Sequence, residues 1–103
     1  MNKKKYIRQN FRNEVFQRDN FKCVFCDEKD NLDAHHITDR SLMPNGGYVK
    51  ENGITLCQKE HHMMAEEYHI SNHKKWFDDM HPDDLYKIIN SSLELAVEKS
   101  KLL

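Results

Sequence analysis

The chain lacks several features that would assign it to a common class of proteins. It has no apolar run of membrane-spanning length, no secretory signal peptide, no internal repeat and no low-complexity segment. It has only three cysteines, and an odd number argues against a framework of disulfides. These absences together predict a cytoplasmic protein with no membrane partner, in which the three thiols stay reduced.

A strong net charge is also missing. The 16 Lys and Arg residues nearly balance the 17 Asp and Glu residues, and a formal net charge of −1 gives no overall attraction to nucleic acid. The signs are unevenly distributed, however, because the first 22 residues carry only two acidic side chains, Glu14 and Asp19, beside many basic ones. Contacts with phosphate are therefore expected at this end, although a solvated tail explains residues 3–5 equally well. The basic residues are Lys3, Lys4, Lys5, Arg8, Arg12, Arg18 and Lys22.

The cysteines have the spacing of a zinc site. Cys23 and Cys26 form a CxxC pair, and two thiolates separated by two residues on a tight turn can bind one ion at about 2.3 Å. Cys57 and a histidine close behind it supply the second half, so all three cysteines are used. We therefore expect a structural Zn²⁺. It would also help a chain of 103 residues, which can bury only a small core, to fold.

Periodicity and turn residues predict the order of the elements. Residues 8–18 are expected to form a helix, residues 32–38 and 54–57 two short strands, and residues 58–69 a second helix. A last helix should begin at Pro82, which is followed by two acidic residues in the first turn. The predicted fold class is therefore α+β, with an apolar stripe on the last helix. That stripe consists of Leu85, Ile88, Ile89, Ser92, Leu93 and Ala96.

Three segments of the sequence resemble the zinc-containing HNH endonucleases. They are RDNFKCVFC at 18–26, LDAHHI at 32–37 and NGITLC at 52–57. The paired histidines, the Asn five residues before a cysteine and a later histidine follow in the family's order, and this combination is specific. The resemblance covers roughly residues 11–70. It divides the chain into an HNH nuclease domain, residues 6–72, and a C-terminal helical extension packing on it, residues 73–103, of a kind often found in small phage-encoded nucleases.

The resemblance implies a fold and an activity. HNH endonucleases, which belong to the His-Me finger type, hydrolyse DNA phosphodiesters. They do so with a small ββα-metal (treble-clef-like) unit, in which two strands and a helix hold one divalent ion. In this chain an N-terminal helix and an appended C-terminal helix would be added to that unit. The implied cofactors are a structural Zn²⁺ and a catalytic divalent ion, which could be Mg²⁺, Mn²⁺, Ni²⁺ or Zn²⁺.

Three residues carry the chemistry in this comparison. Hydrolysis needs a base near neutral pH, a task that suits histidine, and a cation beside the leaving 3′ oxygen. His36 is expected to be the general base and His35 the first ligand of the cation. Since neighbouring residues on a strand point to opposite faces, this division requires the backbone to turn, and the family has a distorted hairpin there. Asn52 is expected to accept a hydrogen bond from the His36 ring and fix its tautomer. The remaining histidines outside the motifs, expected to be surface or packing residues, are His69, His73 and His81.

The end of the motif departs from the family pattern of Cys, two residues, Cys and His. In one register Glu60 takes the place of the last cysteine and His61 binds the catalytic ion. In the other register His61 completes the zinc site, His62 binds the catalytic ion, and Glu66, one helical turn later, is a further ligand. We prefer the second register, because an environment of three thiolates suits an imidazole better than a carboxylate as its fourth member.

The partners are less well defined by the sequence. No separate base-reading module is visible, so contacts with the phosphate backbone of DNA and low sequence specificity are expected. A homodimer, a phage DNA-processing partner and, for a phage-encoded protein, the host cytoplasm are open alternatives. A second class of function also stays open, namely a zinc-stabilised nucleic-acid-binding module without catalysis.

Overall fold

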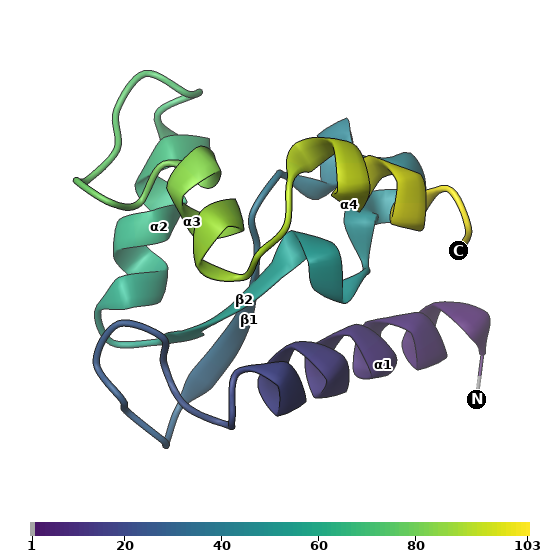
Figure 1. Ribbon diagram of the computed structural model, residues 1–103, viewed down its shortest axis with the longest axis horizontal. Coiled ribbons are helices and arrows are strands. Elements are labelled where there is room, and N and C mark those ends of the chain that lie inside the picture. Colours follow the sequence, from purple (N-terminus) through teal and green to yellow (C-terminus); the bar gives the residue numbers. More distant parts are fainter. Residues whose placement is uncertain (1) are drawn as a thin grey trace.

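The computed structural model describes residues 2–103, which form four α-helices and a two-stranded antiparallel sheet (Figure 1). The α+β class predicted from the sequence is confirmed. Within the described range, no helix is long and apolar enough to cross a membrane. The elements in chain order are α1 (Lys3–Arg18), β1 (Leu32–His36), the 3₁₀ turns η1 (Arg40–Leu42), η2 (Pro44–Gly47) and η3 (Lys50–Asn52), β2 (Gly53–Cys57), α2 (His61–Ile70), α3 (Pro82–Ile88) and α4 (Leu93–Ser100).

The sheet determines which helix each histidine of β1 faces. In the β1–β2 register Leu32 lies opposite Cys57, and His36 lies opposite Gly53. Side chains alternate along β1, so that His35 faces α2 while the ring of His36 stacks on an aromatic side chain of α1. Every residue of β2 is buried. The central hairpin therefore directs two neighbouring histidines to two different helices.

The N-terminal helix is longer than the sequence predicts. It begins at Lys3 rather than near residue 8, because the side chain of Asn2 caps it by accepting a hydrogen bond from Lys5 N at 2.8 Å. Residues 3–5 are therefore a helical turn and not a solvated tail. Their exposed basic side chains therefore belong to the same helix as Arg8, Arg12 and Arg18.

A close approach of α1 to β2 explains the glycine after Asn52. An added Cβ on Gly53 would lie 2.5 Å from Val15 Cγ2 and 2.7 Å from Phe11 Cε1. Gly53 has an ordinary extended backbone, with φ −130° and ψ 150°. The pair Asn52-Gly53 is therefore not a hairpin turn. Its glycine lets the helix carrying Phe11 pack directly on the sheet.

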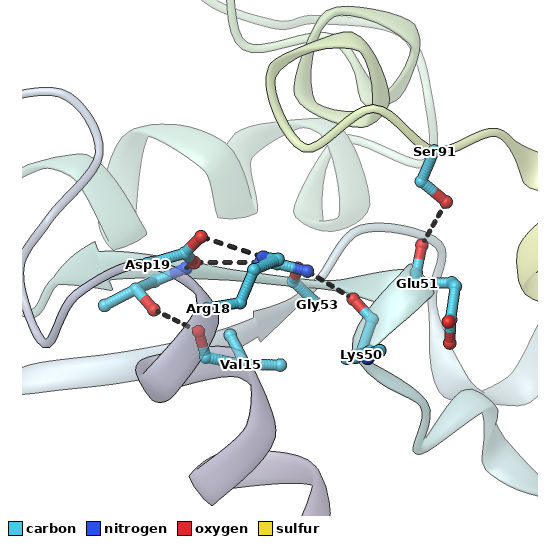
Figure 2. Close-up of polar contacts among 8 residues, drawn as sticks. Val15, Arg18, Asp19, Lys50, Glu51, Gly53 and Ser91 are labelled. Carbon is cyan, nitrogen blue, oxygen red and sulfur yellow. Dashed lines mark hydrogen bonds and ion pairs between the residues drawn. The ribbon is translucent and has the colours of Figure 1, made fainter.

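Hydrogen bonds of Arg18 and Asp19 connect the end of α1 to the start of β2 (Figure 2). Arg18 donates hydrogen bonds to Lys50 O at 2.6 Å and to Gly53 O at 2.7 Å, and it also pairs with Asp19 at 2.8 Å. Asp19 in turn accepts a hydrogen bond from Thr55 N at 2.9 Å. These bonds satisfy strand groups that have no partner on a third strand. They thus protect an edge of the sheet.

The C-terminal helix predicted as one element is two helices. The break falls at Asn90, whose φ of +55° ends α3 and is incompatible with a continuing helix. Ser92 then caps α4 by accepting a hydrogen bond from Leu95 N at 3.0 Å. The predicted apolar stripe is consequently interrupted, and the side chains of Ile88 and Leu93 are about half exposed, at 45% and 50%.

Residues 73–103 pack against the hairpin and the loop that joins its strands. Ser91 Oγ donates a hydrogen bond to Glu51 O at 2.8 Å (Figure 2), and Asn45 Nδ2 donates one to Ser100 O at 3.0 Å. Leu85 and Tyr86 of α3 and Ala96 of α4 belong to the same hydrophobic core as the strands. The helical extension therefore supports the loop that leads into Asn52.

Candidate active site and metal centres

The three cysteines and His61 converge on one point. The CxxC turn lies between α1 and β1, Cys57 ends β2, and His61 begins α2. Cys26 Sγ lies 3.8 Å from Cys57 Sγ, and His61 Nδ1 lies 3.3 Å from Cys57 Sγ and 3.7 Å from Cys23 Sγ. Ligands of a tetrahedral zinc ion with bonds of about 2.0–2.3 Å are separated by about 3.5–3.8 Å. The four side chains therefore have the spacing of a metal site.

The electrostatics of Cys57 agree with this grouping. Burial raises the pKa of its thiol, but hydrogen bonds from His61 outweigh that effect and hold the pKa at about 7. A thiolate is the form of cysteine that binds metals. A lowered pKa thus favours the metal-binding form of Cys57.

A second group of possible ligands consists of His35, His62 and Glu66. His35 Nδ1 lies 3.1 Å from Glu66 Oε1, and His62 Nε2 lies 3.2 Å from the same oxygen. His35 is only 2% exposed, and because its contact with Glu66 lacks hydrogen-bond geometry, its Nδ1 has no hydrogen-bond partner among residues 2–103. An unpaired buried nitrogen is costly unless a cation or a proton completes it, so this arrangement fits a bound divalent ion.

The protonation states of this group suit a metal site. Burial lowers the pKa of His35, which keeps its ring neutral and leaves a lone pair for a ligand bond. The nearby rings of His35 and His62 hold the pKa of Glu66 well below its usual range. Hydrogen bonds with Glu66 and Asp33, in contrast, raise the pKa of His62, so a divalent cation would bind that ring in competition with a proton.

The structure assigns the two adjacent histidines of α2 to different groups. His61 lies with the cysteines, whereas His62 lies with His35 and Glu66. Glu60 is outside both groups. This is the arrangement of the preferred register, in which one residue is inserted relative to the family pattern.

Asp33 is a functional candidate that the sequence did not suggest. Its Oδ2 lies 2.7 Å from His62 Nδ1, and its Oδ1 accepts a hydrogen bond from Gln58 Nε2 at 3.0 Å. A carboxylate behind a ligating histidine fixes its tautomer, so that the opposite nitrogen faces the metal. Here Asp33 directs His62 Nε2 toward Glu66. The only available signal was its position two residues before His35, on the same face of β1.

The ring of His36 lies on the other face of β1, between two aromatic rings. It stacks on Phe11 at a centroid distance of 4.5 Å and meets Tyr48 edge-on at 4.7 Å. Its Nε2 atom is buried without a hydrogen-bond partner in residues 2–103. Burial lowers the pKa of His36 to about 4, helped by His35 and Arg40, so the ring is neutral near pH 7.

Asn52 does not contact the His36 ring, and this part of the prediction is wrong. Its Oδ1 accepts hydrogen bonds from Thr38 N at 3.0 Å and from Tyr86 OH at 2.7 Å. Its Nδ2 donates to Thr38 O at 3.1 Å and to Gly47 O at 3.2 Å. The alternation of β1 sends the His36 ring toward α1, whereas Asn52 faces the loop after the strand. Asn52 therefore positions the backbone that follows His36 and does not fix its tautomer.

Tyr86 completes this network from the helical extension. Burial raises its pKa to about 12, so its hydroxyl stays protonated and can donate to Asn52. The same hydroxyl lies 2.7 Å from Thr38 Oγ1. Tyr86 of α3 thus supports the candidate site. The family resemblance noted in the sequence covers only residues 11–70 and did not indicate this role.

His69 lies at the candidate site, contrary to the expectation of a surface or packing role. Its Nε2 is 3.2 Å from His36 O, and its Nδ1 is buried without a partner in the described residues. His62, Glu66 and His69 follow one another at i, i+4 and i+7 and so share one face of α2. That spacing was the signal that could have identified His69.

The remaining two histidines lie elsewhere. His73 stacks on Tyr68 with ring centroids 4.4 Å apart. His81 caps α3 by accepting a hydrogen bond from Asp83 N at 3.1 Å. His73 is exposed and His81 caps a helix, so neither belongs to the two ligand groups, in agreement with the surface or packing role expected from the sequence.

One cavity of about 260 Å³ connects the second ligand group with His36. Both neighbouring histidines of β1 line this cavity, and the ring of His36 packs at the same time on Phe11 of α1. The residues that line the cavity are Ala34, His35, His36, Asp39, Arg40, His62, Glu66 and His69. Comparisons of the chain with protein-family models, with curated proteins and with solved structures give no match. Any functional assignment therefore depends on the chemistry of this cavity.

Replacing Asp33 with asparagine should weaken divalent-metal binding at the His35–His62–Glu66 group by about 10- to 100-fold. The amide no longer demands one tautomer of His62, so the ligating nitrogen is no longer held toward the ion. Calorimetric titration of Ni²⁺ into the zinc-loaded protein measures the effect. Asp30→Asn, which removes the same charge from an exposed site, is the control. Equal Ni²⁺ affinities in the two variants would show that Asp33 does not position His62.

Proposed function

We propose that this protein is a metal-dependent DNA endonuclease of the HNH type, built on a ββα-metal unit formed by β1, β2 and α2. The observation that carries the proposal is the shared cavity. In it, a neutral, unbonded His36 lies beside three side chains with the spacing and charge of a divalent-metal site. Phosphodiester hydrolysis needs these two components next to each other.

The two ligand groups have different roles in this proposal. Cys23, Cys26, Cys57 and His61 would hold a structural Zn²⁺, because they join the ends of α1, β2 and α2 and leave no open position in a tetrahedral site. His35, His62 and Glu66 would hold Mg²⁺, Mn²⁺, Ni²⁺ or Zn²⁺ with open positions on the cavity side. When bound, that ion supplies stabilisation of the charge on the leaving 3′ oxygen.

The chain's own residues provide the proton transfer and its geometry. His36 accepts the proton of the attacking water, and its stacking between Phe11 and Tyr48 limits the ring to one orientation. Asn52 anchors Thr38, two residues after the base, and the bond from His69 to His36 O restrains the same backbone. These contacts hold the base beside the metal ligands, where a small displacement would be costly for the rate.

Cleavage of supercoiled plasmid by the purified, zinc-loaded protein tests the proposal. Nicked or linear DNA is expected with added Mg²⁺, Mn²⁺ or Ni²⁺, and none is expected after dialysis against a chelator weak enough to leave the structural zinc in place. Glu66→Gln, which keeps the size of the side chain and removes a ligand charge, should show little or no cleavage at the same concentration of added metal. No cleavage under any ion, from folded protein with one zinc per chain, would favour the zinc-stabilised binding module instead.

A further inference from the structure

Basic side chains of α1 extend to the loop beside the candidate active site. Lys4 and Arg8 lie one helical turn apart on α1 and line a shallow cavity of about 130 Å³ together with Tyr48. The guanidinium of Arg8 lies over the Tyr48 ring, 5.6 Å from its centroid. Tyr48 belongs to the segment between the strands. The basic N-terminal helix is therefore connected to the hairpin loop through one tyrosine.

The same tyrosine connects this cavity to the catalytic one. Its hydroxyl accepts a hydrogen bond from Arg40 Nη1 at 2.8 Å, and the centroid of its ring lies 4.7 Å from that of the His36 ring, with the two rings nearly perpendicular. Arg40 lines the cavity that holds His36 and the metal ligands. Tyr48 thus contacts the guanidinium of Arg8 with its ring and that of Arg40 with its hydroxyl. The same ring also contacts His36, the proposed base.

The positive charges along this path are not neutralised within the chain. Among residues 2–103, Lys4, Arg8 and Arg40 form no ion pair with a carboxylate. Asp39, the acidic neighbour of Arg40, has its Oδ1 bonded to the backbone and hydroxyl of Ser41 at 2.9 and 2.7 Å. The three cations are exposed. In a protein of net charge −1, the three cations form a positive path that ends at the active-site cavity, where Asp39 is the acidic neighbour of Arg40.

We propose that Lys4, Arg8 and Arg40, arranged around Tyr48, bind the phosphates of a DNA strand next to the phosphate that is cleaved. The inference rests on the proposed nuclease function and names the surface that holds its substrate. Guanidinium groups suit phosphate because of their paired donors. Their contacts with Tyr48 restrict them before DNA arrives, which reduces the ordering cost of binding. Contacts of this kind position the duplex without reading its bases.

Salt-dependent DNA binding tests the path separately from catalysis. Fluorescence anisotropy with a labelled 20-bp duplex is measured on the zinc-loaded His36→Ala chain, so that no strand is cut. Each of Arg8→Ala and Arg40→Ala, added to that chain, should lower the affinity about fivefold at 0.15 M salt. Each should also reduce the slope of log K against log salt by about 0.9, the effect of one lost phosphate contact. Lys29→Ala, an exposed cation near the Cys cluster, is the charge-matched control and should change neither value.

A further variant distinguishes positioning from charge. Tyr48→Phe keeps every cation but removes the hydroxyl that holds Arg40, so it should weaken binding while leaving the salt slope unchanged. Arg8→Ala and Arg40→Ala variants that bind like Lys29→Ala would overturn the proposed path. If the parent chain cleaves plasmid in that case, the nuclease assignment stands without it. If the parent chain never cleaves but the variants show the expected slopes, the phosphate-binding path is supported and the nuclease function is wrong.

Discussion

Replacing His36 with alanine is expected to reduce plasmid cleavage by about 10²- to 10⁴-fold while leaving the zinc content of the protein unchanged. A general base contributes rate enhancement of this size, and His36 is, with His69, one of the two cavity histidines that neither group of metal ligands uses. The initial rate of nicking at saturating Mn²⁺, with zinc measured by atomic emission, gives both values. His36→Gln is a second variant that preserves more of the packing between Phe11 and Tyr48.

The control for this prediction is a histidine outside the cavity. His73→Ala removes an exposed imidazole stacked on Tyr68 and should cleave at the parent rate. If His36→Ala also cleaves at the parent rate, the base has been assigned wrongly. His69 would then be the next residue to replace, because it lines the same cavity and its buried Nδ1 has no hydrogen-bond partner among residues 2–103.

Much of the fold follows from local patterns in the sequence. The hairpin and α2 were predictable because they contain alternating apolar residues, a cluster of turn residues and the ligand spacing in one short stretch. The break between α3 and α4 was not. Leu85, Ile89 and Ala96 continue a helical period across it, and only the left-handed conformation of Asn90 interrupts them. Periodicity reports which face is apolar, whereas a single backbone torsion decides where the helix ends.

The ligands of the candidate site were predictable for a similar reason. Cys57, His61, His62 and Glu66 are close in sequence, so their spacing on a strand end and one helix limits where they can point. The partners of Asn52 could not be inferred in this way. Tyr86 lies 34 residues further along the chain and meets Asn52 only because α3 packs on the loop.

Loss of the Cys-His site should unfold the protein, and this is the largest effect on stability that we expect. A structural zinc contributes about 10–16 kcal/mol of apparent binding free energy, which equals or exceeds the total stability of about 5–15 kcal/mol typical of a domain. Cys23 and Cys57 are buried in the hydrophobic core, at 0% and 4% exposure. Cys57→Ser, which nearly keeps the side-chain volume, should therefore give a zinc-free chain without a cooperative thermal transition by circular dichroism.

A variant in the His35–His62–Glu66 group is the control for Cys57→Ser. It tests whether unfolding follows from the loss of zinc or from the loss of any ligand residue. Glu66 is partly exposed and lies at the cavity rather than in the core, so Glu66→Gln should keep one zinc per chain and a cooperative transition. A strong chelator should unfold the parent chain, and added Zn²⁺ should restore it, because metal binding supplies folding free energy that a core of this size lacks. A zinc-free Cys57→Ser chain that melts at the parent temperature would mean that hydrophobic packing alone holds α1, β2 and α2 together. The cysteines would then have no structural role.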